Sequence, residues 1–189
     1  DKFGQFIDGK WQSSDSGETY EVINPATEEV IGSPSKANKD DVDKALKSAE
    51  KGLEVWKNTS PWDRAKIIRK ISELIRKEVD TLAKCLTLEV GKPLLEAAGE
   101  VNGAADIFEW NSEETKRIYG QSIQSRFPNT RIQIYYQPVG VVAALVPWNF
   151  PVILAARKIS TALAAGCSVI IKPDVITPGC VMHLVDICK

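Results

Sequence analysis

Two apolar segments near the end of the chain constrain its fold more strongly than any other feature of the sequence. Residues 139–146 are apolar almost without interruption, and residues 167–171 form a second apolar run. The segment between them, 152–165, is helical in composition and is followed by Gly166, a residue type that often ends helices. Long apolar strands are typical of parallel sheets, which are covered on both faces. The sequence therefore predicts a β-α-β unit and an α/β fold class.

Polar side chains follow both predicted strands at their carboxyl ends. Residues 147–151 read Pro-Trp-Asn-Phe-Pro, and Lys172 follows the second strand. Open α/β sheets bind ligands beyond this edge, so the amide of Asn149 and the ammonium of Lys172 suggest a site for an oxyanion and a nucleotide. On local spacing alone, a turn asparagine beside proline and a solvated lysine at a strand end are the simpler interpretations.

Glycine-rich phosphate loops are missing from the places where a nucleotide site would need them. No Gly-x-Gly-x-x-Gly motif follows either strand. Gly91 and Lys92 do not form a phosphate-binding loop, because the required upstream glycine position holds Leu86. A dinucleotide at this site would bind without the usual glycine turn, which argues against a standard Rossmann site.

Other chemically capable side chains lie on the predicted helices. Arg157, beside Lys158, is on an otherwise apolar helix and could clamp a substrate carboxylate through two hydrogen bonds; a surface pair with buried stems is the plainer alternative. Cys180 and His183 are three residues apart, but two ligands do not make a zinc site. A metal or redox protein that uses them with Cys188 is the weakest functional alternative, and packing is the expected role of the cysteines.

The part of the chain before the β-α-β unit is predicted to be mainly helical. Asp8-Gly9 lies between apolar residues and is typical of a tight hairpin turn, and residues 20–23 predict a short strand. Residues 131–136 alternate in polarity and predict a strand with one wet face, which could pair with another chain. Start and stop signals predict helices over 38–53, 60–75, 79–90 and 94–119, and a last helix from Pro178.

Composition excludes some functions. The net charge is −1, with 24 Lys and Arg against 25 Asp and Glu, which argues against a nucleic-acid binder that acts through a basic face. No run of about 18 apolar residues is present, so no membrane span is expected. Four irregularly spaced cysteines are typical of a reduced, cytoplasmic protein. The chain stops inside a helical pattern, so a fragment of a longer protein is expected.

Several motifs along the chain together resemble the aldehyde dehydrogenase superfamily. The Pro-Trp-Asn-Phe-Pro segment at 147–151 is followed by Ala-Leu-Ala-Ala-Gly-Cys at 162–167, Ile-Lys-Pro at 171–173 and Thr-Pro at 177–178. Further segments that match the pattern of that family are 6–11, 24–27 and 89–93. Within the superfamily, Arg157-Lys158 together with 162–167 is most similar to succinate-semialdehyde dehydrogenases.

The resemblance implies a domain organisation. Residues 1–120 would form an N-terminal helical portion with a short hairpin, 121–138 an oligomerisation strand region, and 139–189 the start of a Rossmann-like NAD(P)-binding domain. The cofactor fold of this family dispenses with the glycine fingerprint, which removes the objection raised above. The resemblance also implies a homo-oligomer, either a dimer or a tetramer.

The resemblance implies a reaction as well. A cysteine thiolate attacks an aldehyde, the side-chain amide of Asn149 holds the oxyanion, and hydride passes to NAD or NADP before a glutamate base helps water release the acid. Arg157 matches the residue that binds the distal carboxylate of succinate semialdehyde. The residues that match the cofactor site are Pro147, Trp148, Lys172, Pro173, Asp174 and Val175.

Two departures from the family pattern affect these expectations. The nucleophilic cysteine and the glutamate base of the family lie beyond residue 189, so this chain alone is not expected to complete catalysis. Val175 stands where many NAD-preferring relatives carry a glutamate that repels a 2′-phosphate, so tolerance of NADP is expected. If 189 residues were the natural length, a non-catalytic dinucleotide-binding or assembly module would be the alternative.

Overall fold

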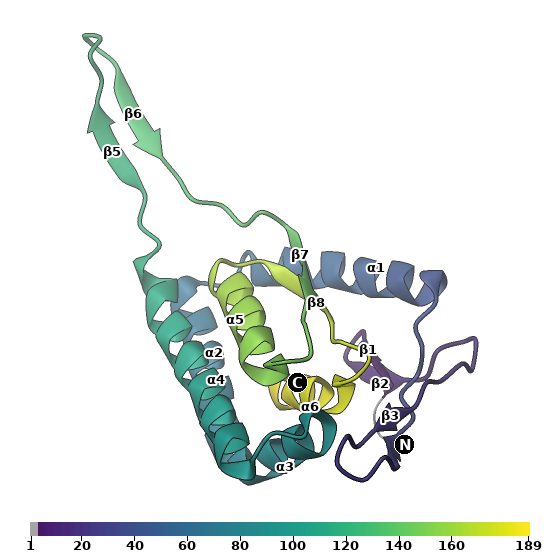
Figure 1. The fold of residues 1–189 in the computed structure, drawn as a ribbon. Helices are drawn as coiled ribbons and strands as arrows, with labels where there is room; N and C mark the ends of the chain where they lie inside the picture. The colour runs from purple at the N-terminus through teal and green to yellow at the C-terminus, as the bar shows by residue number, and fades with distance from the viewer. Residues whose placement is uncertain (1–3) are drawn as a thin grey trace.

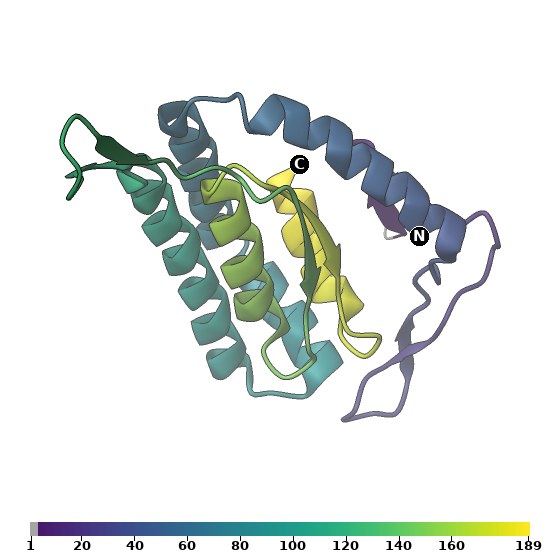
Figure 2. The ribbon, with the colours of Figure 1, turned by 90° about the horizontal axis from the view of Figure 1, so that it is seen from above.

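The computed structural model describes residues 4–189, and Figure 1 shows how they are arranged. Residues 1–3, the first part of the predicted N-terminal portion, lie outside the described residues. The chain is α/β, and two parallel strands, β7 (Val141–Leu145) and β8 (Ser168–Lys172), lie between layers of helices. Helix α1 (Lys39–Trp56) covers one face of this pair and α5 (Pro151–Ala164) covers the other (Figure 2).

The structure confirms the predicted β-α-β unit. β7 and β8 are in register from Val141 opposite Ser168 to Leu145 opposite Lys172, and α5 is the crossover helix. The first strand begins two residues later than predicted, because Gly140, with a φ of 119°, turns the chain just before it. The prediction that this strand is buried was wrong in part. Among residues 4–189, β7 pairs with no strand other than β8, and Leu145 stays 64% exposed.

The hydrophobic core lies among helices behind the strand pair. Helices α2 (Pro61–Lys77), α3 (Val79–Val90), α4 (Leu94–Glu114) and α6 (Pro178–Cys188) pack with α5 around it. Gly103 lets α4 and α5 approach closely, since a Cβ there would lie 3.1 Å from Ile153 Cδ1. Burying one large apolar side chain contributes about 1.5–3 kcal/mol. The fully buried side chains include Ile68, Ile75, Leu82, Leu86 and Phe108.

Most helix boundaries follow the predicted signals. Ser60 caps α2 with Pro61 as the first helical residue, and Gly91 ends α3 with a φ of 78°. Helix α4 is an exception, because it ends at Glu114 and a 3-10 turn (Thr115–Arg117) follows, whereas the prediction extended it to residue 119. The chain leaves the helical path there to enter a hairpin, where a Cβ on Gly120 would lie 2.4 Å from the Ile134 carbonyl oxygen. None of the helices in the described range is both long and apolar enough to span a bilayer.

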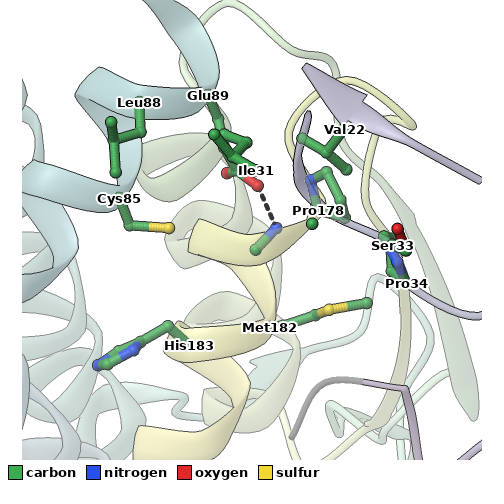
Figure 3. A pocket seen from close by; sticks show the side chains of 12 residues that line it. Val22, Ile31, Ser33, Pro34, Cys85, Leu88, Glu89, Pro178, Met182 and His183 are labelled. Carbon is green, nitrogen blue, oxygen red and sulfur yellow. Dashed lines mark hydrogen bonds between the residues drawn. The ribbon is translucent and has the colours of Figure 1, made fainter. Parts of the chain in front are cut away.

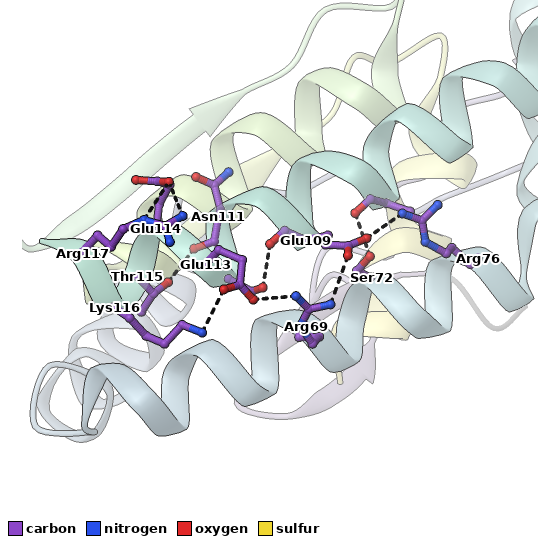
Figure 4. Close-up of polar contacts among 12 residues, drawn as sticks. Arg69, Ser72, Arg76, Glu109, Asn111, Glu113, Glu114, Thr115, Lys116 and Arg117 are labelled. Carbon is purple, nitrogen blue, oxygen red and sulfur yellow. Dashed lines mark hydrogen bonds and ion pairs between the residues drawn. The ribbon is translucent and has the colours of Figure 1, made fainter.

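Charged side chains join α2 to α4 along their exposed seam (Figure 4). Arg69 bridges Glu109 and Glu113 at 3.1 and 2.5 Å. Arg76 bridges Asp106 and Glu109 at 2.6 and 2.8 Å. Hydrogen bonds from Arg69 and Lys116 hold the pKa of Glu113 at about 2. Each exposed ion pair contributes little to the free energy of folding. The network therefore mainly fixes the register of α2 against α4, whereas burial of apolar side chains in the core holds the two helices together.

Two small antiparallel sheets precede α1. In the first, β1 (Gln5–Ile7) pairs with β2 (Lys10–Gln12), and the turn residues Asp8 and Gly9 have φ values of 52° and 75°, as the predicted type I′ turn requires. In the second, the predicted short strand is confined to β3 (Val22–Ile23) and pairs with β4 (Val30–Gly32), which was not predicted. Trp11 Nε1 donates to Asp186 Oδ1 at 2.8 Å and so anchors the first hairpin to α6.

A long hairpin projects from the body of the molecule (Figure 1). It consists of β5 (Gln121–Gln124) and β6 (Arg131–Ile134), paired in register from Gln121 opposite Ile134. The sequence analysis predicted one strand over 131–136 with a single wet face. The structure corrects this, because every residue of both strands is exposed, the strand ends at Ile134, and its partner is β5 of the same chain.

Asn38 caps α1, as its position before the helix predicts, and the structure adds a capping box with Asp41. Asn38 accepts a hydrogen bond from Asp41 N at 2.9 Å, and the Asp41 carboxylate accepts from Asn38 N at 3.0 Å. The same carboxylate also accepts from Ser14 Oγ at 2.5 Å and Gln5 Nε2 at 3.1 Å. These bonds, with that from Ser14 the strongest influence, lower the pKa of Asp41 from 3.8 to about 2. Asp41 therefore ties the N-terminal segment to α1 in its ionised form.

Acid should weaken this attachment. Because the pKa of Asp41 is lower in the folded protein, its stabilising effect is present above pH 3.8 and is lost as the pH falls towards about 2. The free energy of unfolding, measured by urea denaturation across that range, should fall more for the wild type than for Asp41→Asn. Parallel pH profiles for the two proteins would contradict this assignment.

Candidate functional site

The strand ends bring the two predicted halves of the site together. Val146 N donates to the Lys172 carbonyl oxygen at 3.1 Å, so the segment that follows β7 runs beside the end of β8. Pro151 is the first residue of α5, where a missing N–H costs nothing. Residues 147–150 therefore form a short loop between proline residues at 147 and 151, fixed at one end by β8 and at the other by α5.

Asn149 lies in this loop with its side chain exposed. Within residues 4–189 its side-chain amide has no hydrogen-bond partner, whereas its main-chain oxygen accepts a hydrogen bond from Lys92 Nζ at 3.2 Å. The neighbouring Trp148 and Phe150 are 53% and 50% exposed. The loop therefore presents an amide donor and aromatic surface at the carboxyl edge of the sheet.

Lys172 is exposed at the end of β8 and forms no ion pair within the described residues. The turn after it is shaped by Asp174, whose Oδ1 accepts from Ile176 N at 3.1 Å and whose carbonyl oxygen accepts from Thr177 N at 3.3 Å. Val175 is 54% exposed on that turn. The structure thus groups the residues predicted for the cofactor site, 147–148 and 172–175, with Asn149 at one edge.

Arg157 is set apart from that edge. It is exposed on α5, one helical turn from both Ile153 and Thr161, and six residues after the start of the helix. Six residues of α-helix span about 9 Å. Within residues 4–189 the Arg157 guanidinium forms no ion pair, so the charge is available to an anion.

The N-termini of α5 and α6, which follow the two strands, are both capped by carboxylates from distant helices. Glu100 of α4 accepts hydrogen bonds from Val152 N at 2.9 Å and Ile153 N at 3.1 Å. Glu89 of α3 accepts from Gly179 N at 2.6 Å and Cys180 N at 2.9 Å. Burial raises the pKa of Glu89, although these hydrogen bonds oppose the rise. Sequence reasoning missed both glutamates, because each acts on residues more than fifty positions away.

Burial keeps three of the four thiols of the described residues in the protonated, weakly nucleophilic form. Burial raises the pKa values of Cys85 and Cys188 to about 12, and it also raises that of Cys180. Only the thiolate form of cysteine is a good nucleophile or metal ligand. No group of three or more His, Cys, Asp or Glu residues in the described range is arranged to hold a metal ion. His183 Nε2 lies 3.7 Å from Glu78 Oε2, and Cys180 Sγ donates to the Thr177 carbonyl oxygen at 3.6 Å.

A cavity of about 370 Å³ lies elsewhere, between β4 and helices α3 and α6 (Figure 3). Glu89, Met182 and His183 line it together with Cys85 and residues 31–34. None of the predicted site residues lines this cavity. We place the candidate site at the sheet edge, because the segments that follow β7 and β8 lie side by side there and both carry exposed polar side chains.

A parallel β-α-β unit with polar residues at its carboxyl edge is typical of α/β proteins that bind a ligand beyond that edge. The chain belongs to the aldehyde dehydrogenase family, whose profile residues 11–189 match. It is 42% identical over 184 residues to glutarate-semialdehyde dehydrogenase of Pseudomonas aeruginosa, covering 97% of this chain and 38% of that protein. It is 40% identical over 181 residues to the succinate-semialdehyde dehydrogenase (NADP(+)) GabD of Escherichia coli, with 96% and 38% coverage.

The fold is shared with solved structures. A crystal structure of an NADP-dependent enzyme of Escherichia coli superposes with a TM-score of 0.94 at 40% identity, covering 96% of this chain and 38% of that one. The chain therefore spans about 38% of the length of the relatives that it matches. The family and the α/β fold predicted from the motifs are confirmed.

Proposed function

We propose that the complete protein is a cytoplasmic enzyme that oxidises a carboxylated aldehyde, such as succinate or glutarate semialdehyde, to the acid with NADP or NAD. The observation that carries this proposal is the placement of Asn149 and Lys172 at one edge, joined through the hydrogen bond from Val146 N to the Lys172 oxygen. Both semialdehydes appear in the names of relatives at 40% identity or more.

Asn149 would act on the oxygen of the aldehyde. When a thiolate adds to an aldehyde, the carbonyl oxygen gains negative charge, and an amide N–H that already points at it stabilises the transition state more than the substrate. The exposed Asn149 amide, which has no partner among residues 4–189, is free to make that bond. The attacking cysteine and the glutamate base are expected beyond residue 189.

The residues at the sheet edge fit a nicotinamide dinucleotide. Lys172 offers an unpaired ammonium to ribose hydroxyls or a phosphate, and the half-exposed ring of Trp148 offers an apolar wall. Pro147, Pro173 and Asp174 shape the two loops. The cofactor, when bound, supplies the hydride acceptor. Val175 presents no charge towards a 2′-phosphate, so this position adds no electrostatic repulsion against NADP.

Arg157 would select the substrate. Its unpaired guanidinium matches a carboxylate in shape and can form two parallel hydrogen bonds. A carboxylate at the far end of the aldehyde from the reacting carbon could therefore be bound along α5 while the aldehyde lies near Asn149. The exposed β5–β6 hairpin supports the further part of the proposal that the protein is a homo-oligomer, a dimer or a tetramer.

Steady-state kinetics of the complete protein test this function. We expect formation of reduced cofactor with succinate and glutarate semialdehydes, at a kcat/KM at least about tenfold above that for butanal, which lacks the carboxylate. We also expect NADP to be accepted. Equal turnover of butanal would refute the substrate assignment. A strong preference for NAD would refute the role given to Val175. Absence of turnover with every aldehyde would favour a binding or assembly module.

A further inference from the structure

We infer that Lys92 and Glu100 form a positioning pair for the Asn149 loop, an inference that rests on the proposed role of Asn149. The two residues lie on either side of the α3–α4 junction, and Lys92 directly follows Gly91, which ends α3. Neither touches the predicted reacting atoms. Their contacts instead converge on residues 149–153, the segment that carries the oxyanion donor.

Glu100 is buried and fully engaged. Its side chain is 1% exposed, and its Oε1 accepts hydrogen bonds from Val152 N and Ile153 N at the start of α5. Its Oε2 pairs with Lys92 Nζ at 2.5 Å. A buried carboxylate is stable only when paired and hydrogen-bonded, so Glu100 needs both Lys92 and the end of α5.

Lys92, the other member of the pair, contacts the Asn149 loop directly. Its side chain is 11% exposed, and besides Glu100 its ammonium donates to the Asn149 carbonyl oxygen at 3.2 Å. The same ammonium lies 4.1 Å from the centroid of the Phe150 ring. One cation therefore holds the main chain at Asn149 and the aromatic ring that follows it.

This arrangement matters because the Asn149 side chain has no other restraint. Its amide is exposed and without a hydrogen-bond partner among residues 4–189, so its direction is set by the main chain that carries it. Oxyanion donors act only when held within about 0.5 Å of the productive position. Lys92 holds the Asn149 carbonyl oxygen, and Glu100 holds the N–H groups of Val152 and Ile153 at the start of α5. The pair therefore fixes, at two points, the main chain that carries the Asn149 amide.

The alternative is a purely structural role, in which the pair only stabilises the start of α5. Kinetics of the complete protein distinguish the two. Lys92→Met keeps the length of the side chain but removes the ammonium, and it should lower kcat about tenfold with little change in KM for the aldehyde. Lys92→Arg should recover most of the loss. Ser72→Ala, which removes a buried hydrogen bond to the Ala105 oxygen between α2 and α4, is the stability control and should leave kcat unchanged.

Glu100→Gln provides a second variant in case Lys92→Met folds poorly. Glutamine can still accept hydrogen bonds from Val152 and Ile153, but it lacks the charge that holds Lys92. If the pair acts through the loop, this variant should lower kcat by a similar factor of about ten. Wild-type kcat in the folded Glu100→Gln protein would overturn the inference.

A double-mutant cycle with Asn149→Ala decides the question. If Lys92 acts through Asn149, Lys92→Met should lower kcat in the wild type but cause little further loss in the Asn149→Ala background. An equal loss in both backgrounds, or no loss in either, would overturn the pair while leaving the proposed function intact. If Asn149→Ala itself retains wild-type kcat, the oxyanion role fails, and the positioning role fails with it.

Discussion

Replacing Asn149 with alanine should lower kcat of the complete enzyme by about 10²–10³-fold, which corresponds to about 3–4 kcal/mol of transition-state stabilisation. KM for the aldehyde should change little, because the hydrogen bond strengthens only as negative charge develops on the oxygen. The measurement is the initial rate of cofactor reduction at saturating aldehyde and cofactor. Asn149→Asp should be at least as impaired, since a carboxylate would repel the developing oxyanion.

Asn102→Ala is the matched control for this substitution. Asn102 is also exposed, and its amide donates only to the Ala98 oxygen one turn earlier on α4. It should retain wild-type kcat. If Asn149→Ala kept kcat within about twofold of the wild type, or raised only KM, Asn149 would not be an oxyanion donor. It would then be a turn asparagine beside proline, the simpler interpretation of its position.

Replacing Arg157 with leucine should raise KM for succinate semialdehyde by about 10–100-fold, because a charge-assisted hydrogen-bonded pair contributes about 1.5–3 kcal/mol. Turnover of an uncharged aldehyde such as butanal should be unaffected, so the ratio of the two kcat/KM values is the measurement. The uncharged substrate acts as the internal control for folding and cofactor binding.

Arg117→Leu is the matched control for loss of an exposed guanidinium. Arg117 pairs with Glu114 at 2.7 Å in the 3-10 turn, away from α5. It should leave the preference for the carboxylated substrate unchanged. Equal losses for charged and uncharged aldehydes in Arg157→Leu would show that Arg157 supports the helix rather than the substrate.

Local signals predicted much of the fold because they act within a few residues. The cap at Asn38, the proline at position 61 and the left-handed Gly91 each set a helix boundary through neighbouring backbone groups. The two apolar runs likewise identified β7 and β8. The partner strand β5 was missed, because its sequence Gln-Ser-Ile-Gln holds one apolar residue and so lacks any alternation.

In the candidate site too, the sequence indicates residues that follow a strand but not residues that reach the loop from far along the chain. Asn149 and Lys172 were predicted because each follows a strand, and the resemblance to the family implies their roles, which stay predictions. Lys92 and Glu100 were not predicted, because they reach the loop across 57 and 52 residues of sequence. Gly91-Lys92 lacks the upstream glycine of a phosphate loop, and the lysine contacts the chain's own carbonyl and carboxylate groups instead.

The capped helices have a consequence for how a nucleotide is recognised. A β-α-β unit ordinarily offers free N–H groups at a helix start to a phosphate. Here the N–H groups at the starts of α5 and α6 already donate to Glu100 and Glu89. A diphosphate would find these N–H donors already occupied. In the proposed cofactor site, a dinucleotide would therefore have to be held without those helix N–H groups, and the ammonium of Lys172 would be the cation at this edge that can contact its ribose or a phosphate.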